Sequence, residues 1–260
     1  MGKNNEIKKL IETFHSEYTR NGEPIRINFR EIVTELSSTE RYSHLIHSYP
    51  AKLLCHIPYF FLQTDYFCPE NGVVLDPFCG TGTVMLEANI SGRNAKGADA
   101  NPLACLISKV KTTYIKKEDL QKTLGTIISR AKRFNTNECI DTSSVSRWFS
   151  KSTISQLWHL ECAIKKVRDT KQQDFFMMCL SNLVKKVSFA DPSISVPVKL
   201  NPERFAQHPE RMETARFKLK TLENIDVYDK FENVCQLNIN RIESLKDVYS
   251  KGITSEVISN

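Results

Sequence analysis

The 260-residue sequence lacks several patterns that mark well-known classes of protein. Its eight cysteines are scattered and form no Cys-x-x-Cys pair, which argues against a zinc or disulfide framework and favours reduced thiols. No apolar run approaches the length of a membrane span, so we expect no membrane partner. The first residues lack the apolar stretch of a secretory signal, and we therefore expect a cytoplasmic protein.

Composition indicates a globular chain with one large domain, or one domain with a sizeable insertion. Hydrophobic residues make up 40% of the sequence, which is enough to form a core. The net charge of +6 suits a nucleic-acid partner but does not require one, because many cytosolic proteins are mildly basic. His44, His47 and His56 have no partners at metal-ligand spacing, so we predict no metal site.

Residues 73–83 combine an apolar run, an acidic residue and a tight glycine turn. They read Val-Val-Leu-Asp-Pro-Phe-Cys-Gly-Thr-Gly-Thr, and the apolar residues that follow predict a helix. A strand, a glycine-rich turn and a helix place a ligand at the carboxyl end of the strand. A second acidic residue, Asp99, follows about twenty residues later, where such folds hold ribose hydroxyls.

The turn does not fit the common phosphate-binding patterns. A P-loop would continue with Gly-Lys-Ser or Gly-Lys-Thr, whereas this chain has Gly82-Thr83-Val84. A dinucleotide fingerprint would show three spaced glycines, and only Gly80 and Gly82 are present. An ordinary glycine-rich turn between a strand and a helix remains the plain alternative.

Residues 76–83 closely resemble the S-adenosylmethionine (SAM) loop of amino-group methyltransferases, which runs Asp-Pro-Phe-x-Gly-Ser/Thr-Gly-Thr. A carboxylate at this loop suits SAM, because SAM carries an ammonium and a sulfonium but no phosphate. The resemblance implies SAM as the cofactor. It also implies an α/β fold, a Rossmann-like class I methyltransferase sheet that is incomplete in this chain and carries a helical insertion.

The resemblance covers roughly residues 43–113 and implies a set of cofactor-binding residues. Residues 47–53 would pack over the methionine end of SAM, Asp99 would take the ribose hydroxyls and Asn101 would line the adenine. In a third segment, residues 237–241, Asn238 or Asn240 would take the place of an acidic residue near the adenine edge. The predicted cofactor-binding residues are Tyr49, Pro50, Lys52, Asp76, Pro77, Phe78, Gly80, Thr81, Gly82, Thr83, Asp99, Ala100, Asn101 and Asn238.

Hydrophobic periodicity and the resemblance divide the chain into four parts. They are an N-terminal helical segment (1–46), the SAM-binding subdomain (47–115), a helical insertion (116–225) and a return to the sheet (226–260). Within these parts we predict strands over 73–75, 95–98, 234–239 and 255–258, and helices over 1–22, 83–91 and 102–112. One or two more helices are expected between residues 26 and 46.

The insertion offers candidate contacts for DNA. Its basic stretches are 130–133, 165–168 and 185–186, and each alone is typical of a solvated helix face. Three of them in one insertion favour a side that contacts DNA phosphates. Trp148, beside Arg147, could stack on a base or anchor the core of the insertion.

The catalytic motif of amino-methyltransferases is missing from this sequence. That motif runs Asp/Ser/Asn-Pro-Pro-Tyr/Phe/Trp; its polar groups bind the target amine and its aromatic ring stacks on the flipped base. The chain has no Pro-Pro dipeptide, and Asp191-Pro192 and Asn201-Pro202 lack the aromatic residue as well. It also has no Pro-Cys pair, which cytosine-C5 methylation would need. We therefore predict no catalytic residue within this chain.

The resemblance thus implies the SAM-binding half of a split DNA methyltransferase that acts on cytosine N4 or adenine N6, in a restriction–modification or phage-defence setting. A second subunit would supply the catalytic motif and pair with the sheet edge near residues 255–260, and the heterodimer would act on double-stranded DNA. Two alternatives stay open. One is an RNA guanine methyltransferase-like protein, and the other is a non-catalytic truncated or regulatory paralogue.

Overall fold

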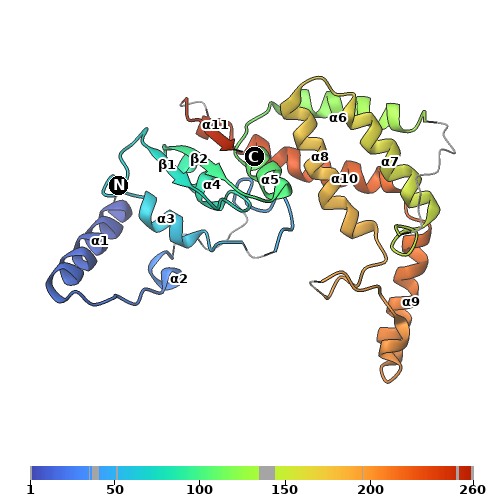
Figure 1. Cartoon of the computed structure of the whole chain (residues 1–260), viewed down its shortest axis with the longest axis horizontal. Coiled ribbons are helices and arrows are strands. Elements are labelled where there is room, and N and C mark those ends of the chain that lie inside the picture. The colour runs from blue at the N-terminus through green and yellow to red at the C-terminus, as the bar shows by residue number, and fades with distance from the viewer. Residues whose placement is uncertain are drawn as a thin grey trace. The chain divides into compact units, whose positions relative to one another are not determined.

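The computed structural model describes residues 2–34, 36, 41–50, 52–134, 144–194, 196–249 and 252–258; for residues 2–5 it describes only the backbone. The chain forms two compact units, which are residues 1–114 with 241–260 and residues 115–240. The first unit carries the sheet and the second is helical (Figure 1). Among the described helices, none has the length and apolar character needed to cross a membrane.

Three parallel strands form the sheet of the first unit, in the order β1-β2-β3. They are β1 (Val73–Asp76), β2 (Asn94–Ala98) and β3 (Ser255–Ile258). Helix α4 (Thr83–Ile90) connects β1 to β2, and α5 (Pro102–Lys111) follows β2. These bounds confirm the predicted strands and helices of this region to within one residue. The α/β class is likewise confirmed, with a Rossmann-like sheet that is incomplete in the described chain.

The two faces of this sheet differ in cover. Val74 and Val257 pack against a buried cluster that α3 (His56–Leu62), α4 and β2 supply. The cluster consists of Leu62, Cys79, Met85, Ala88 and Ala95. Because side chains alternate along a strand, Val73 and Leu75 lie on the opposite face, where both are exposed.

β3 comes from a distant part of the sequence, and the buried Asn89 of α4 fastens it to the unit. Asn89 Oδ1 accepts hydrogen bonds from the hydroxyls of Tyr249 and Ser255, both at 2.6 Å. Burial raises the pKa of Tyr249, which keeps this hydroxyl protonated as a donor. Tyr249 belongs to the short helix α11 (Lys246–Tyr249), so the side-chain amide of Asn89 positions both β3 and the helix before it.

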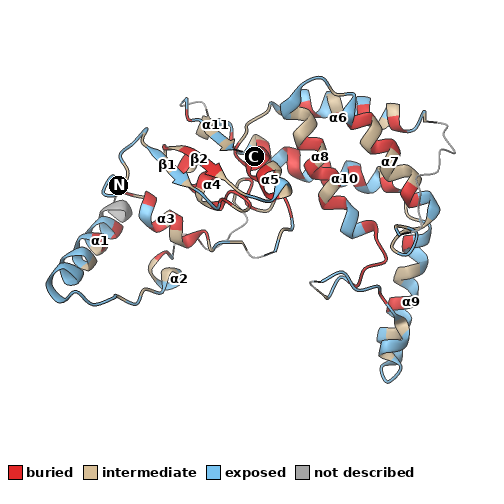
Figure 2. Ribbon diagram, viewed as in Figure 1, coloured by how far each residue is buried: buried red, intermediate tan, exposed pale blue. Residues whose placement is uncertain are grey.

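The N-terminal part of the first unit adds a small helical layer. Helix α1 (Gly2–Asn21) confirms the predicted helix, and α2 (Phe29–Ile32) is the described helix of the region between residues 26 and 46. Ile7 and Ile11 of α1 are buried against Phe60 of α3. The outer side of α1 is exposed along most of its length (Figure 2).

The second unit is a set of packed helices. Its elements are α6 (Lys117–Ala131), α7 (Lys151–Lys165), α8 (Thr170–Val184), η1 (Lys185–Val187), η2 (Pro202–Phe205), α9 (Pro209–Glu223) and most of α10 (Val227–Glu243). Fully buried aromatic rings fill its core: Phe175 lies 5.1 Å from Phe176, which lies 6.4 Å from Phe231 of α10. Asp191-Pro192 lies in a loop after η1.

The strand predicted over residues 234–239 is wrong, because these residues belong to α10. The short stretch Val-Cys-Gln-Leu-Asn-Ile alternates like a strand, but the burial over a longer window has helical spacing. Val227, Phe231, Cys235, Asn238 and Ile242 are buried, whereas Leu237 is 59% exposed. The helical unit therefore extends to Asn240 instead of ending near 225, and the chain rejoins the sheet only at β3.

Close packing at Gly97 of β2 gives a testable prediction. A Cβ added to Gly97 would overlap Met85 Sδ and lie 2.9 Å from Cys79 Cβ, whereas one added to Gly125 of α6 meets nothing within 4 Å. We expect Gly97→Ala to destabilise the sheet by roughly 1–3 kcal/mol and Gly125→Ala to stabilise α6 by about 0.5–1 kcal/mol. Urea titration followed by hydrogen–deuterium exchange of β2 and α6 peptides measures both; equal effects would contradict the packing described.

Candidate cofactor site

The turn after β1 is held in place by bonds to its neighbours. Gly80 and Gly82 have positive φ angles of 50° and 70°, a region that glycine enters without strain. The amide of Cys79 donates to the carbonyl of Ala98 at 2.8 Å, and Ser108 Oγ of α5 donates to the carbonyl of Gly80 at 2.8 Å. The turn is thus fixed between β2 and α5 at the carboxyl end of the sheet.

Asp99 joins the turn after β1 to the turn after β2. Its Oδ2 accepts a hydrogen bond from the amide of Gly80 at 2.9 Å, and its Oδ1 accepts one from the amide of Asn101 at 2.8 Å. A carboxylate has about four acceptor positions, so these two bonds leave acceptor capacity on each oxygen. Asp99 can therefore hold the two turns and still bind the hydroxyls of a ligand.

Asn101 brings a third segment to the same place. Its Oδ1 accepts from the amide of Leu103 at 2.9 Å, which caps the start of α5, and its Nδ2 donates to the hydroxyl of Tyr49 at 2.9 Å. Tyr49 belongs to the segment predicted to cover the cofactor. The contact between Tyr49 and Asn101 therefore places that segment beside the carboxyl end of β2.

Asp76 ends β1 and lies close enough to Asp99 for their charges to interact. Burial raises the pKa of Asp76, the charge of Asp99 raises it further, and a hydrogen bond from the amide of Phe78 at 3.2 Å opposes this. Among the described residues, no cationic side chain forms an ion pair with either carboxylate. This end of the sheet therefore favours a ligand that carries positive charge and hydroxyl groups.

A basic cavity lies beside the first residue of α4. It has a volume of about 230 Å³, and its lining includes Arg30, His44, Lys52 and Thr83. Lys52 Nζ donates to the carbonyls of His44, at 3.4 Å, and His47. Burial lowers the pKa of Lys52, and the nearby charge of Arg241 lowers it further. The cavity suits an anionic group, although the ammonium of Lys52 already binds backbone carbonyls.

A buried ion cluster fastens to α4 the segment that carries Arg41, His44 and Tyr49. Glu87 of α4 is fully buried; its carboxylate binds the guanidinium of Arg41 and, at 2.6 Å, Nε2 of His44. Lys111 is also fully buried, and burial lowers its pKa to about 7, with the charge of Lys52 adding to the shift and Glu87 opposing it. Glu87 therefore positions the residues that lead to Tyr49 and Lys52.

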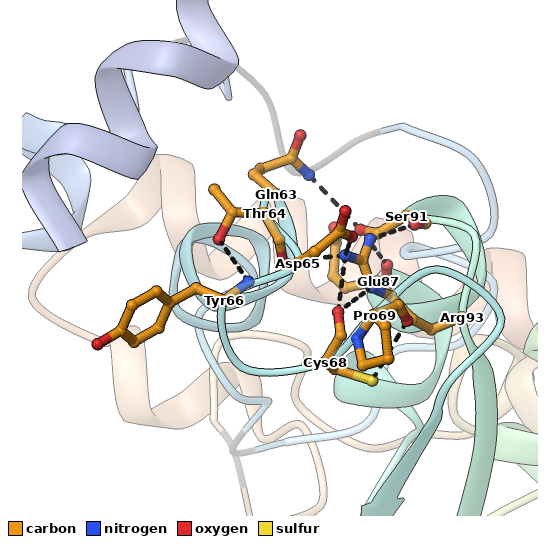
Figure 3. A network of polar contacts seen from close by, with 9 residues as sticks. All are labelled: Gln63, Thr64, Asp65, Tyr66, Cys68, Pro69, Glu87, Ser91 and Arg93. Carbon is orange, nitrogen blue, oxygen red and sulfur yellow. Dashed lines mark hydrogen bonds and ion pairs between the residues drawn. The ribbon is translucent and has the colours of Figure 1, made fainter. Parts of the chain in front are cut away.

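A larger cavity, of about 540 Å³, lies around residues 62–71 and 90–93. Figure 3 shows the guanidinium of Arg93 at this place, among the carbonyls of Thr64 and Cys68 and the carboxylate of Asp65, at 2.8–3.1 Å. Asn71 and Gly92 in its lining flank the amino ends of β1 and β2. Ligands of open parallel sheets bind at the carboxyl ends, so we assign this cavity no cofactor and regard Arg93 as a structural clamp.

The structure gathers most of the predicted site at one end of the sheet. The turn from Asp76 to Thr83, the turn from Asp99 to Asn101 and the segment that carries Tyr49 are linked there by the bonds described above. Asn238 is an exception, because it lies within α10, where its Nδ2 donates to Sγ of Cys179 at 3.5 Å. Its predicted role at the adenine depended on a strand over residues 234–239, and these residues are helical.

Glu87, Arg41 and His44 were not predicted from the sequence. A single glutamate in an apolar helix was the available signal, because α4 is otherwise built from apolar and small residues. Such a charge is buried only when it is paired. Its partners lie more than 40 positions away, so local pattern does not reveal them.

The basic residues of the helical unit are partly engaged in packing. Lys166 lies over the ring of Phe134 at 4.9 Å, Lys132 lies 5.9 Å from the ring of Tyr228, and Lys165 pairs with Glu161. Trp148 is half-buried, with the exposed Arg147 at 5.9 Å from its ring. These contacts support a structural role for several of the cations and leave DNA binding by this unit a prediction.

Comparisons with known proteins match the part of the chain that carries this site. Residues 20–110 match the family model of the N6/N4 amino-methyltransferases, described as DNA methylase. Residues 20–110 belong to the DNA amino-methyltransferase family. This methylase region contains β1, β2, α4, all of α5 but its last residue, and the contacts of Glu87 with Arg41 and His44. No solved structure matches the chain.

Two curated relatives support the same family. The chain is 27% identical over 211 residues to the Type II methyltransferase M.MvaI of Kocuria varians, which covers 76% of this chain and 46% of the relative. It is 32% identical over 104 residues to the Type II methyltransferase M.MjaII of Methanocaldococcus jannaschii, which covers 39% of this chain and 19% of the relative. The chain thus spans less than half the length of the relatives that it matches.

The buried cluster of the methylase region gives a second prediction. We expect Glu87→Gln to lower the free energy of unfolding by about 3 kcal/mol, because it leaves the guanidinium of Arg41 without its counter-charge and weakens the hydrogen bond to His44, whose pKa burial lowers. Glu256→Gln is the matched control, since Glu256 pairs with Lys96 at 3.0 Å on the surface and should change stability by less than about 1 kcal/mol. Urea unfolding of both variants measures the difference. A Glu87→Gln variant as stable as the control would show that the cluster is not structural.

Proposed function

We propose that the residues at the carboxyl ends of β1 and β2 form the SAM-binding side of a cytoplasmic DNA amino-methyltransferase. This enzyme methylates cytosine N4 or adenine N6. The observation that carries the proposal is the pair Asp76 and Asp99 beside a glycine turn, without a cationic partner among the described residues. SAM presents an ammonium, a sulfonium and ribose hydroxyls, and these groups match two carboxylates. When bound, SAM supplies the methyl group for the transfer.

Each part of the site has a separate task in this proposal. Asp99 accepts the ribose hydroxyls with the acceptor capacity that Gly80 and Asn101 leave free. Asp76 stabilises the positive charge of the methionine part. Asn101 and Tyr49 border the adenine side, where their mutual hydrogen bond fixes both side chains.

The basic cavity beside Thr83 receives the α-carboxylate of SAM. Arg30, His44 and Lys52 all contribute to its lining, so it attracts an anion. Thr83 also starts α4, whose amino end favours negative charge. The carboxylate pair therefore receives the cationic and hydroxyl groups of the cofactor, and this cavity receives its carboxylate.

The acceptor side of the reaction comes from polypeptide outside these residues. A target amine must be held by polar groups and its base by an aromatic ring, and the 260 residues contain no Pro-Pro-aromatic motif that could do so. We propose that a second subunit provides this motif, so that the active enzyme is a heterodimer. The alignment with only 46% of M.MvaI is compatible with a further part of the enzyme outside these residues.

We propose double-stranded DNA as the substrate. Both curated relatives are Type II methyltransferases, a name that belongs to restriction–modification systems. The matched family is that of DNA methylases, which speaks for DNA over RNA guanine as the acceptor. The net charge of +6 is compatible with this polyanionic partner.

Calorimetry of SAM binding tests the cofactor site. We expect Asp99→Asn and Asp76→Asn each to weaken binding about tenfold or more, because each removes a charge-assisted interaction. Glu70→Gln is the matched control, since Glu70 is an exposed carboxylate in the lining of the other cavity and should leave the affinity unchanged. Unchanged affinity in both aspartate variants would remove the basis for the site.

Methyl transfer from labelled SAM tests whether the enzyme consists of two different chains. We expect no transfer to DNA by this chain alone, and transfer after addition of the neighbouring gene product if that product carries a Pro-Pro-aromatic motif. Replacement of its two prolines by alanine should abolish transfer, and tRNA should accept no methyl group. Methylation of DNA by the purified chain alone would contradict the proposal.

A further inference from the structure

We infer that Lys111 supplies further positive charge to the cofactor site, because its side-chain amine takes up a proton from solvent when the α-carboxylate of SAM enters the basic cavity beside Thr83. This inference rests on the proposed function and deepens it, since it names a residue that responds to the bound carboxylate. Three observations carry it, namely the burial of Lys111, the lack of a partner for its amine among the described residues, and the cations that line the cavity.

Lys111 is the last residue of α5, and its side chain is fully buried in the first unit. Its Nζ forms no hydrogen bond with any described residue, and it takes part in no ion pair there. The backbone at this place is fixed, because the hydroxyl of Ser43 donates to the carbonyl of Lys111 at 2.7 Å. A lysine is almost never fully buried without a partner, and an apolar side chain here would avoid the cost of desolvation. Packing alone therefore does not explain the amine.

The carboxylate of Glu87 attracts a proton to Lys111, but its oxygens are already engaged. Oε2 binds the guanidinium of Arg41, and Oε1 lies 2.6 Å from Nε2 of His44. Burial opposes protonation of Lys111, and the charge of Lys52 opposes it further, so its pKa lies at about 7. Near neutral pH, Lys111 therefore exchanges between the neutral amine and the ammonium.

The groups around Lys111 and the cavity differ in whether their charge changes near neutral pH. The charged and titratable side chains are Glu87 of α4, Arg41, His44, Lys52 and Cys55 of the segment that leads into α3, Arg241 of α10 and Arg30 of α2. The arginines stay charged. Burial lowers the pKa of His44 and raises the pKa of Cys55, so both are neutral above pH 7. The ammonium of Lys52 is held by two backbone carbonyls. Lys111 is thus the group that can gain a proton.

A carboxylate in the basic cavity raises the pKa of Lys111. It places a negative charge beside Lys52 and offsets the repulsion that Lys52 exerts on Lys111. Because the complex then holds the proton more tightly than the free protein, SAM affinity is greatest below pH 7. It falls as the pH rises through the pKa of the free protein toward that of the complex. A rise of one pKa unit corresponds to about a tenfold difference in affinity between the two ends of this range.

Calorimetry of SAM binding between about pH 6 and 8.5, in buffers of different ionisation enthalpy, tests the inference. Lys111→Met removes the amine and keeps most of the length of the side chain. Lys109→Met is the matched control, because Lys109 is an exposed lysine of the same helix. We expect the unmodified chain and the control to take up more protons per SAM than Lys111→Met, by up to one. Their affinity should also fall about tenfold more across this range.

The α-ammonium of SAM titrates in the same range, but it contributes equally to all three proteins, so the difference between them reports Lys111 alone. Equal proton uptake in the unmodified chain and in folded Lys111→Met would overturn the inference. So would the loss of all SAM binding in that variant, because the neutral amine of the unmodified chain also permits binding. Urea unfolding shows whether the variant is folded.

Carbon-13 NMR of labelled lysine side chains keeps the inference testable if Lys111→Met does not fold. In the unmodified chain, SAM should move upward the midpoint of the lysine signal that titrates near pH 7. A midpoint that SAM leaves unchanged, or moves downward, would contradict the role of Lys111. Failure of the unmodified chain to bind SAM at any pH in this range would instead overturn the proposed function.

Discussion

The site depends on the carboxylate of Asp99, which binds the amides of Gly80 and Asn101 at the same time. These two amides belong to the turns that follow β1 and β2, so one side chain sets the distance between the ends of two strands. Asn101 extends the connection to Tyr49. Because the three segments share this carboxylate and its neighbour, the site is organised before any ligand arrives, which reduces the entropy that binding must remove.

A second constraint on the site is electrostatic. The buried charge of Glu87 needs Arg41 and His44, and both come from the segment that leads to Tyr49 and Lys52. An apolar residue at position 87 would leave Arg41 without its counter-charge and would not fix that segment. The ion cluster thus connects the stability of the methylase region with the position of the residues that cover the cofactor.

These constraints organise one candidate site. The cofactor loop, the carboxylates and the basic cavity are assembled by contacts within the first unit, whereas the binding of a target base needs groups that this sequence does not contain. Val73, Leu75 and Phe78 are apolar and exposed on the same part of the first unit.

Local pattern determined the elements around the cofactor loop. The apolar run of β1, the glycines after it and the helical spacing of α4 and α5 lie within about forty consecutive residues. Within each of these elements, the spacing of apolar residues follows the period of the strand or helix, which is why the bounds could be predicted to within one residue. The same reasoning failed for residues 234–239, because six residues are too few to distinguish a strand from one side of a helix.

By itself, the sequence determined the fold class and the glycine turn after β1, since each is expressed in neighbouring residues. Only the tertiary structure decided the pairing of β3 with β2, the partners of Glu87, the place of Asn238 within α10 and the exposure of Val73 and Leu75. These features depend on residues brought together from distant parts of the chain. Burial and strand order are properties of the folded chain, so no local pattern records them.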